Sequence, residues 1–176
     1  MALVWLLISD RDLPTRRLLG FAALDTLEGL GVIAFDQACR LSQAQATLDR
    51  LEAELTVTEA AVLLPTARRA VEALRRCQDG FFLTSRVTPS TVGVPDRSGP
   101  DRVLTKEDAV AQYLRILRNA VHGFTGENDS QRRRDEVLLM AHDGNIPGDV
   151  SFLPYLYWVD VLLDPSRWRR RLAPRR

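Results

Sequence analysis

The sequence predicts an all-α fold, a bundle of about five or six helices with one long irregular loop at residues 84–104. Apolar residues recur at helical spacing over most of the chain, as in helices that bury one face. Residues 2–8 are a continuous apolar run, but no second convincing strand exists to pair with them, so they too are assigned as helix. Prolines and glycines punctuate residues 84–104, which predicts a connecting loop.

The first half of the chain predicts two longer helices after this run. Residues 15–54 carry apolar side chains at roughly helical spacing, and Gly29 and Gly31 are the positions at which that helix can break. Residues 58–79 predict a second helix, which begins properly or bends at Pro65.

The second half predicts three more helices. Residues 105–108 resemble a capping box, and a strong helix follows them to Phe124. Gly123 is a plausible end for that helix. Residues 130–142 predict the next helix, and the very apolar residues 151–163 predict the last.

The composition indicates one globular domain. We expect a helical bundle over residues 1–165, followed by a basic tail at 166–176. The net charge is +1, so no overall field favours a polyanionic partner. Of the 24 basic residues only Lys106 is a lysine, which indicates a genome rich in G and C. Selection of arginine for its planar phosphate contacts would give the same composition.

No segment predicts export or insertion into a membrane. The apolar start has no basic region before it and is followed by charged residues, unlike a signal peptide. No uncharged apolar span reaches about 18 residues, the length that predicts a membrane helix. We therefore expect a cytoplasmic protein. Cys39 and Cys77 lie far apart in apolar, helix-like contexts, which predicts buried thiols rather than a disulfide.

The helix expected at 109–124 has two distinct faces. Its apolar residues fall on one arc, which we expect to face the core: Val110, Tyr113, Leu114, Leu117, Val121 and Phe124. Arg115, Arg118 and His122 lie within about 60° of one another on the opposite side, and Asn119 borders them. Polar groups of this kind are not buried without partners, so this face meets water, another subunit or a ligand.

These residue types suit cleavage of a phosphodiester bond by an internal 2′-hydroxyl. A histidine moves protons near neutral pH. An arginine binds phosphate oxygens and stabilises the charge that develops on them, and an asparagine orients a hydroxyl or the imidazole. The reaction requires no metal or other cofactor. It requires a general acid and a general base, which two copies of His122 across a dimer would supply.

A structural interpretation of the same residues remains open. His122 lies near a helix C-terminus, where the helix dipole favours a charged imidazole, and arginines on an outer face are often only solvated. His142 is expected to be another helix-end histidine or a second group of the site. Together with Asp143 and His122 it makes a poor metal site, because no cysteines at ligand spacing accompany them.

Residues 117–123, with the sequence LRNAVHG, resemble the motif helix of the HEPN superfamily. The family motif is an arginine, often followed by a polar residue such as asparagine, and then four to six residues before a histidine. Three residues separate Arg118 from His122, and six separate Arg115 from His122. The resemblance implies a compact, often dimeric helical bundle. It assigns catalysis first to His122, then to Arg118 and Asn119, and then to Arg115.

The resemblance also implies a function. Many HEPN proteins are metal-independent ribonucleases of toxin–antitoxin, abortive-infection or CRISPR defence, and others are binding modules without activity. We therefore expect an endoribonuclease or toxin that cleaves RNA as a homodimer, with a cognate antitoxin or other protein as a further partner. The alternative is a non-catalytic helical module that binds a partner protein or RNA.

Two basic segments are candidate RNA contacts. Their residues are Arg132, Arg133, Arg134, Trp168, Arg169, Arg170 and Arg171. Arginine beside an aromatic residue suits single-stranded nucleic acid, through phosphate attraction and base stacking. A solvated helix face at the first segment and a frayed, charged C-terminus at the second explain the same residues.

Overall fold

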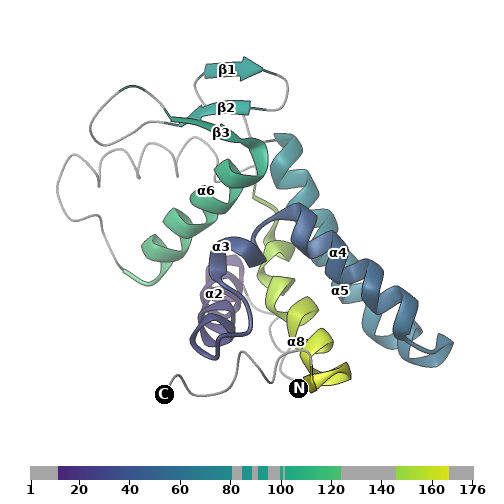
Figure 1. The fold of residues 1–176 in the computed structure, drawn as a ribbon. Coiled ribbons are helices and arrows are strands. Elements are labelled where there is room, and N and C mark those ends of the chain that lie inside the picture. The colour runs from purple at the N-terminus through teal and green to yellow at the C-terminus, as the bar shows by residue number, and fades with distance from the viewer. Residues whose placement is uncertain are drawn as a thin grey trace.

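The computed structural model describes residues 12–80, 85–88, 91–94, 100, 102–123 and 146–166. Its elements follow in the order α2 (Leu13–Gly29), α3 (Phe35–Ala38), α4 (Leu41–Glu54), α5 (Val57–Gly80), β1 (Ser85–Thr88), β2 (Thr91–Val94), β3 (Arg102–Thr105), α6 (Lys106–Val121), the 3₁₀ helix η2 (Gly148–Phe152) and α8 (Leu153–Leu163). Helix α8 lies between α2 on one side and α4 and α5 on the other (Figure 1).

Three helices cover the range 15–54, so the expectation of a single continuous helix there is wrong. Helix α2 ends at Gly29, and Gly31 adopts a φ of 69°, in the left-handed region that glycine enters without steric cost. The chain then turns into the short helix α3 and continues into α4. The break falls at the two glycines that the sequence marked as weak points.

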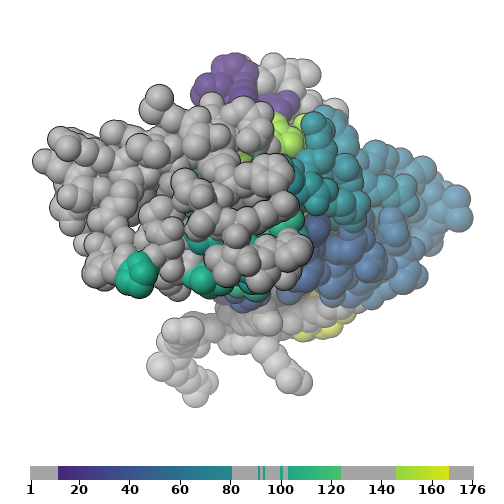
Figure 2. All heavy atoms as spheres, turned by 90° about the horizontal axis from the view of Figure 1, so that it is seen from above, coloured from purple at the N-terminus to yellow at the C-terminus, as the bar shows by residue number. Residues whose placement is uncertain are grey.

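Helices α4 and α5 pack against each other and extend together at one side of the molecule (Figures 1 and 2). Helix α5 confirms the helix expected over residues 58–79 and runs through Pro65 without ending. Proline removes one backbone hydrogen bond from a helix interior. Pro65 is exposed, so the carbonyl that loses its partner lies on the solvent side of the helix.

The last predicted helix, 151–163, begins later than expected, because η2 occupies the residues up to Phe152. Helix α2 approaches η2 closely at Gly20, where an added Cβ would lie 2.6 Å from the backbone oxygen of Ser151. Helix α8 is buried along most of its length. The hydroxyl of Tyr157 donates a 2.8 Å hydrogen bond to the backbone oxygen of Ala38, which joins α8 to α3.

A three-stranded antiparallel sheet, in the order β1-β2-β3, lies within the segment 84–104 and at its C-terminal edge. The expectation of an irregular loop there is therefore wrong for the described residues. Strands β2 and β3 contact α6, and β3 leads directly into that helix (Figure 1). The sheet thus fixes the point at which the helix that carries the candidate site begins.

The all-α fold class is confirmed, because six α-helices form the body of the part of the chain that the structure describes. The helices expected at 2–8 and 130–142 and the tail beyond residue 166 lie outside the described residues. Cys39 and Cys77 are free and buried, as expected. None of the helices in the described ranges is long and apolar enough to cross a membrane.

Candidate functional site

Helix α6 carries the candidate site and forms where the sequence predicted it. Thr105 caps its start by accepting a hydrogen bond from the backbone N–H of Asp108. His122 is the C-terminal cap, and Gly123 leaves the helix with a φ of 75°. The arc expected to face the core is buried at Val110, Tyr113, Leu114 and Leu117. The polar face of the helix therefore points away from the core.

Arg118 lies against two acidic residues and an aromatic ring. Its Nη1 is 3.4 Å from Asp25 Oδ1 and 4.0 Å from Glu28 Oε2. Its guanidinium carbon lies 4.9 Å from the centroid of the Phe35 ring, a favourable cation–π distance. The side chain is 25% exposed, so the cation is held at the edge of the core by α2 and α3.

His122 reaches the same carboxylate as Arg118. Its Nε2 lies 3.4 Å from Asp25 Oδ2, and its side chain is 19% exposed. Arg118 and His122 are four residues apart, which places them one above the other on the helix. Asp25 is therefore shared by an imidazole and a guanidinium. A carboxylate in that position can orient the imidazole.

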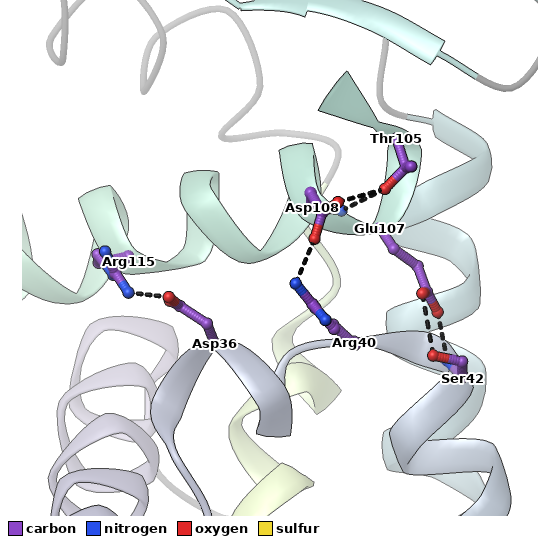
Figure 3. Close-up of polar contacts among 7 residues, drawn as sticks. All are labelled: Asp36, Arg40, Ser42, Thr105, Glu107, Asp108 and Arg115. Atoms are coloured by element: carbon purple, nitrogen blue, oxygen red, sulfur yellow. Dashed lines mark hydrogen bonds and ion pairs between the residues drawn. The ribbon is translucent and has the colours of Figure 1, made fainter. Parts of the chain in front are cut away.

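Arg115 does not join this group. It forms an ion pair with Asp36 of α3 (Figure 3). Its side chain is 53% exposed. Asn119 is half-buried on the same helix. Of the four predicted residues, the structure thus brings Arg118 and His122 together on one acidic partner and places Arg115 on another.

The start of α6 is attached to the N-terminal end of α4. Glu107 accepts hydrogen bonds from the backbone N–H and the hydroxyl of Ser42 at the first turn of α4. Arg40 donates to Asp108 over 2.6 Å. Figure 3 shows both contacts beside the Arg115–Asp36 pair. These contacts fix the position of α6 relative to α3 and α4.

Sequence reasoning missed Asp25, Glu28 and Phe35 as parts of the site. They precede Arg118 by more than 80 positions, and local patterns do not report such a contact. One signal was present, because Asp25 and Glu28 are the acidic residues that interrupt the apolar stretch from Leu18 to Phe35. Charged groups on a largely apolar helix require partners when they are partly buried.

The Asp25 contacts are looser than a structural ion pair of the same chain. Arg50 binds Asp160 through two hydrogen bonds of 3.0 and 2.8 Å, and the side chain of Asp160 is 0% exposed. Arg118 Nε and Asp25 Oδ1 are buried atoms for which no hydrogen-bond partner is found in the described part of the chain. The guanidinium of Arg118 is therefore less fully hydrogen-bonded than that of Arg50.

The thiol of Cys39 lies beneath this group. Burial raises its pKa well above the ordinary value, and nearby Cys77, Glu28 and Asp25 act in the same direction, whereas Arg118 opposes them. A thiol in this state is not a nucleophile, because the reactive species is the thiolate. The chemistry of the site therefore belongs to the imidazole, the guanidinium and the carboxylates.

The remaining sequence-predicted groups are not placed. His142 and Asp143 and both basic segments, 132–134 and 168–171, lie outside the described residues. Within the described ranges, no group of three or more histidine, cysteine or acidic side chains is arranged to hold a metal ion.

No family model, curated protein or solved structure matches this chain.

Proposed function

We propose that this protein is a HEPN-like, metal-independent endoribonuclease that acts as a homodimer. The observation that carries the proposal is the convergence of His122 and Arg118 on one carboxylate, that of Asp25. A proton-transfer group, a phosphate-binding group and an orienting carboxylate then lie together on a partly exposed surface, and two copies across a dimer would supply the general acid and the general base that cleavage of RNA requires.

The reaction that fits these groups is an internal transfer. The ribose 2′-hydroxyl attacks the adjacent phosphorus, and the bond to the 5′-oxygen breaks. The products are a 2′,3′-cyclic phosphate and a 5′-hydroxyl. One His122 accepts the 2′-hydroxyl proton, and the protonated His122 of the second copy donates a proton to the leaving oxygen. Arg118 stabilises the charge on the phosphate oxygens, with Arg115 and Asn119 at the border of the site.

The spacing between Arg118 and His122 is one residue shorter than the HEPN motif, but it still brings the two side chains together. Four positions along a helix bring two side chains to neighbouring places on one face. The loose contacts of Arg118 with Asp25 and Glu28 permit exchange of a carboxylate for a phosphate oxygen, since both bind a guanidinium through the same donors.

The test is cleavage of single-stranded RNA in EDTA. We expect the parent protein to cleave and the His122→Ala variant to lose at least a hundredfold in rate, because general acid–base catalysis contributes about 10²–10⁴. Arg75→Ala is the matched control. Arg75 is an exposed arginine of α5 that binds Glu72 of the same helix and Gln45 of α4, so its loss should leave cleavage unchanged. Equal residual cleavage by the parent and the His122→Ala variant would reject the proposal.

The dimer requirement has its own measurement. Sedimentation of the parent across a concentration range should show a reversible dimer, and the rate per chain should rise as the dimer forms. Mixing excess His122→Ala protein with the parent should lower the rate per parent chain, since mixed dimers hold a single His122. A rate per parent chain that is independent of the added variant would exclude a shared site.

A second candidate function is a non-catalytic helical module that binds a partner protein or RNA. One observation favours it: Arg115 and Arg118 are each neutralised by a carboxylate within the same chain. In that case the pairs hold α6 onto α2 and α3. Neither the parent nor the His122→Ala variant would cleave RNA, and both would retain a stable partner.

A further inference from the structure

A second cluster of arginines lies where α2, α5 and η2 meet, apart from the residues of the candidate site. Arg16 of α2 and Arg69 of α5 both approach Asp149 at the start of η2. Arg69 binds it through contacts of 3.1 and 3.2 Å, and Arg16 Nη2 is 3.8 Å away, beyond hydrogen-bond distance. Two guanidinium charges therefore share one carboxylate.

The guanidinium groups are fixed by apolar and backbone surfaces. Both lie over the buried ring of Phe152, at 5.8 Å for Arg16 and 5.2 Å for Arg69. Arg16 also lies directly against Gly148, where an added Cβ would be 1.9 Å from its Nη2. The lack of a side chain at Gly148 thus provides the space that the end of Arg16 occupies.

Arg16 is poorly satisfied for a cation in this position. Its side chain is 18% exposed, and its Nε is a buried donor without a hydrogen-bond partner in the part of the chain that the structure describes. A buried donor that makes no hydrogen bond lowers stability, and more so when it is charged. An anion that bound beside Arg69 would bring a second negative charge to this cluster.

We propose that Arg16 and Arg69 form a site for a phosphodiester group of a nucleic-acid strand. The charges select this class of ligand. Two arginines and Asp149 carry a net charge of +1, which one singly charged phosphodiester neutralises and a phosphate dianion exceeds. A single strand can place one phosphate against the mostly buried guanidinium of Arg16, whereas the flat surface of a membrane cannot reach it. The site is separate from His122 and does not depend on the proposed cleavage.

The test is the binding of a labelled single-stranded RNA 12-mer, followed by fluorescence anisotropy in EDTA. All proteins carry His122→Ala, so that cleavage does not consume the probe. We expect Arg69→Ala to weaken binding at least fivefold and to reduce the slope of log affinity against log salt by about 0.7, the value for one phosphate contact on a single strand. Circular dichroism confirms that each variant is folded.

Three further variants identify the site. Arg68→Ala is the matched control, because Arg68 is the exposed neighbour of Arg69 and pairs with Glu52; its effect should be less than twofold. Gly148→Ala should weaken binding several-fold by displacing the end of Arg16. Asp149→Asn should strengthen binding several-fold, because it removes the internal competitor and raises the net charge of the cluster.

The proposal is overturned by any of three results. In the first, Arg68→Ala and Arg69→Ala weaken binding equally, which would indicate a general electrostatic attraction of RNA to the basic surface. In the second, Asp149→Asn leaves the affinity for RNA unchanged, which would make Asp149 a purely structural partner of the two arginines. In the third, the protein is also tested with vesicles that contain phosphatidylglycerol, and binding that depends on Arg69 is found with these vesicles but not with the RNA 12-mer. None of these results bears on cleavage at His122.

Discussion

Asp160 is the most deeply buried carboxylate among the described ion pairs, and Arg50 holds it through two short hydrogen bonds. A carboxylate is transferred to such a position at a large desolvation cost, which a bidentate arginine offsets. The pair joins α4 to α8 at the centre of the fold. The Arg50–Asp160 pair is therefore the structural ion pair with which the other ion pairs of this chain are compared.

Replacement of Arg50 by alanine removes the bidentate cation from a buried carboxylate. We expect the free energy of unfolding to fall by about 3–5 kcal/mol, measured by urea denaturation. Arg68→Ala, which breaks the exposed pair with Glu52, should lower it by no more than about 1 kcal/mol. Equal effects of the two substitutions would contradict the assigned structural role of Asp160.

Asp25 is the residue on which the candidate site depends, and the sequence did not identify it. Histidine and arginine four positions apart on one helix face were visible locally. Their acidic partner was not, because it lies on another helix. For Arg115 the error is of another kind. Its position on the helix predicted a single cluster with Arg118, but in the structure Arg115 pairs with Asp36 and Arg118 with Asp25. A helix face can be predicted from spacing, whereas the groups that meet it are decided by packing.

Asp25→Asn should reduce cleavage of RNA by roughly tenfold or more, because the uncharged amide orients the imidazole of His122, the proposed proton-transfer group, less firmly. The loss should appear mainly in kcat. Asp36→Asn is the matched control, since Asp36 pairs with Arg115 and not with His122. A larger loss with Asp36→Asn than with Asp25→Asn would show that Asp25 is not the carboxylate that orients His122.

At the scale of elements, the sequence predicted long helices well and the small sheet not at all. Helices α5 and α6 carry a regular apolar face and begin and end within a few residues of the expected positions. The strands are four residues each, too short for alternation to be visible, and prolines and glycines lie between and within them.

Thr105 joins β3 to α6, because it is the last residue of the strand and the N-terminal cap of the helix. Thr105→Ala should lower the free energy of unfolding by about 1 kcal/mol, within the range of about 0.5–2 kcal/mol for loss of such a cap. Urea denaturation measures it. Thr58→Ala, at an exposed position in the first turn of α5, is the control and should change stability by less than about 0.5 kcal/mol. Equal losses would exclude a capping role for Thr105.

At the scale of the whole molecule, several helices contribute to one hydrophobic core, and the thiols of Cys39 and Cys77 and the phenol of Tyr157 are among the groups enclosed in it. Burial raises the pKa of Cys77 to about 12, while Arg17 and Arg76 act in the opposite direction. Burial likewise raises the pKa of Cys39 and of Tyr157, and Tyr157 lies close enough to Cys39 for their charges to interact. These groups therefore stay neutral in the folded chain at a pH at which they ionise in the unfolded chain.

This difference predicts loss of stability in base. A group whose pKa is raised by folding contributes its full stabilisation below its unfolded pKa, which is 9.0 for Cys77. That contribution is lost as the pH rises from about 9 toward 12, because only the unfolded chain releases the proton. Each such group lowers the free energy of unfolding by up to about 1.4 kcal/mol per pH unit. Urea denaturation at pH 7, 9 and 10.5 measures the slope. Cys77→Ala should be less stable at pH 7 but should lose less stability between pH 9 and 10.5, and an unchanged slope would show that Cys77 ionises equally in both states.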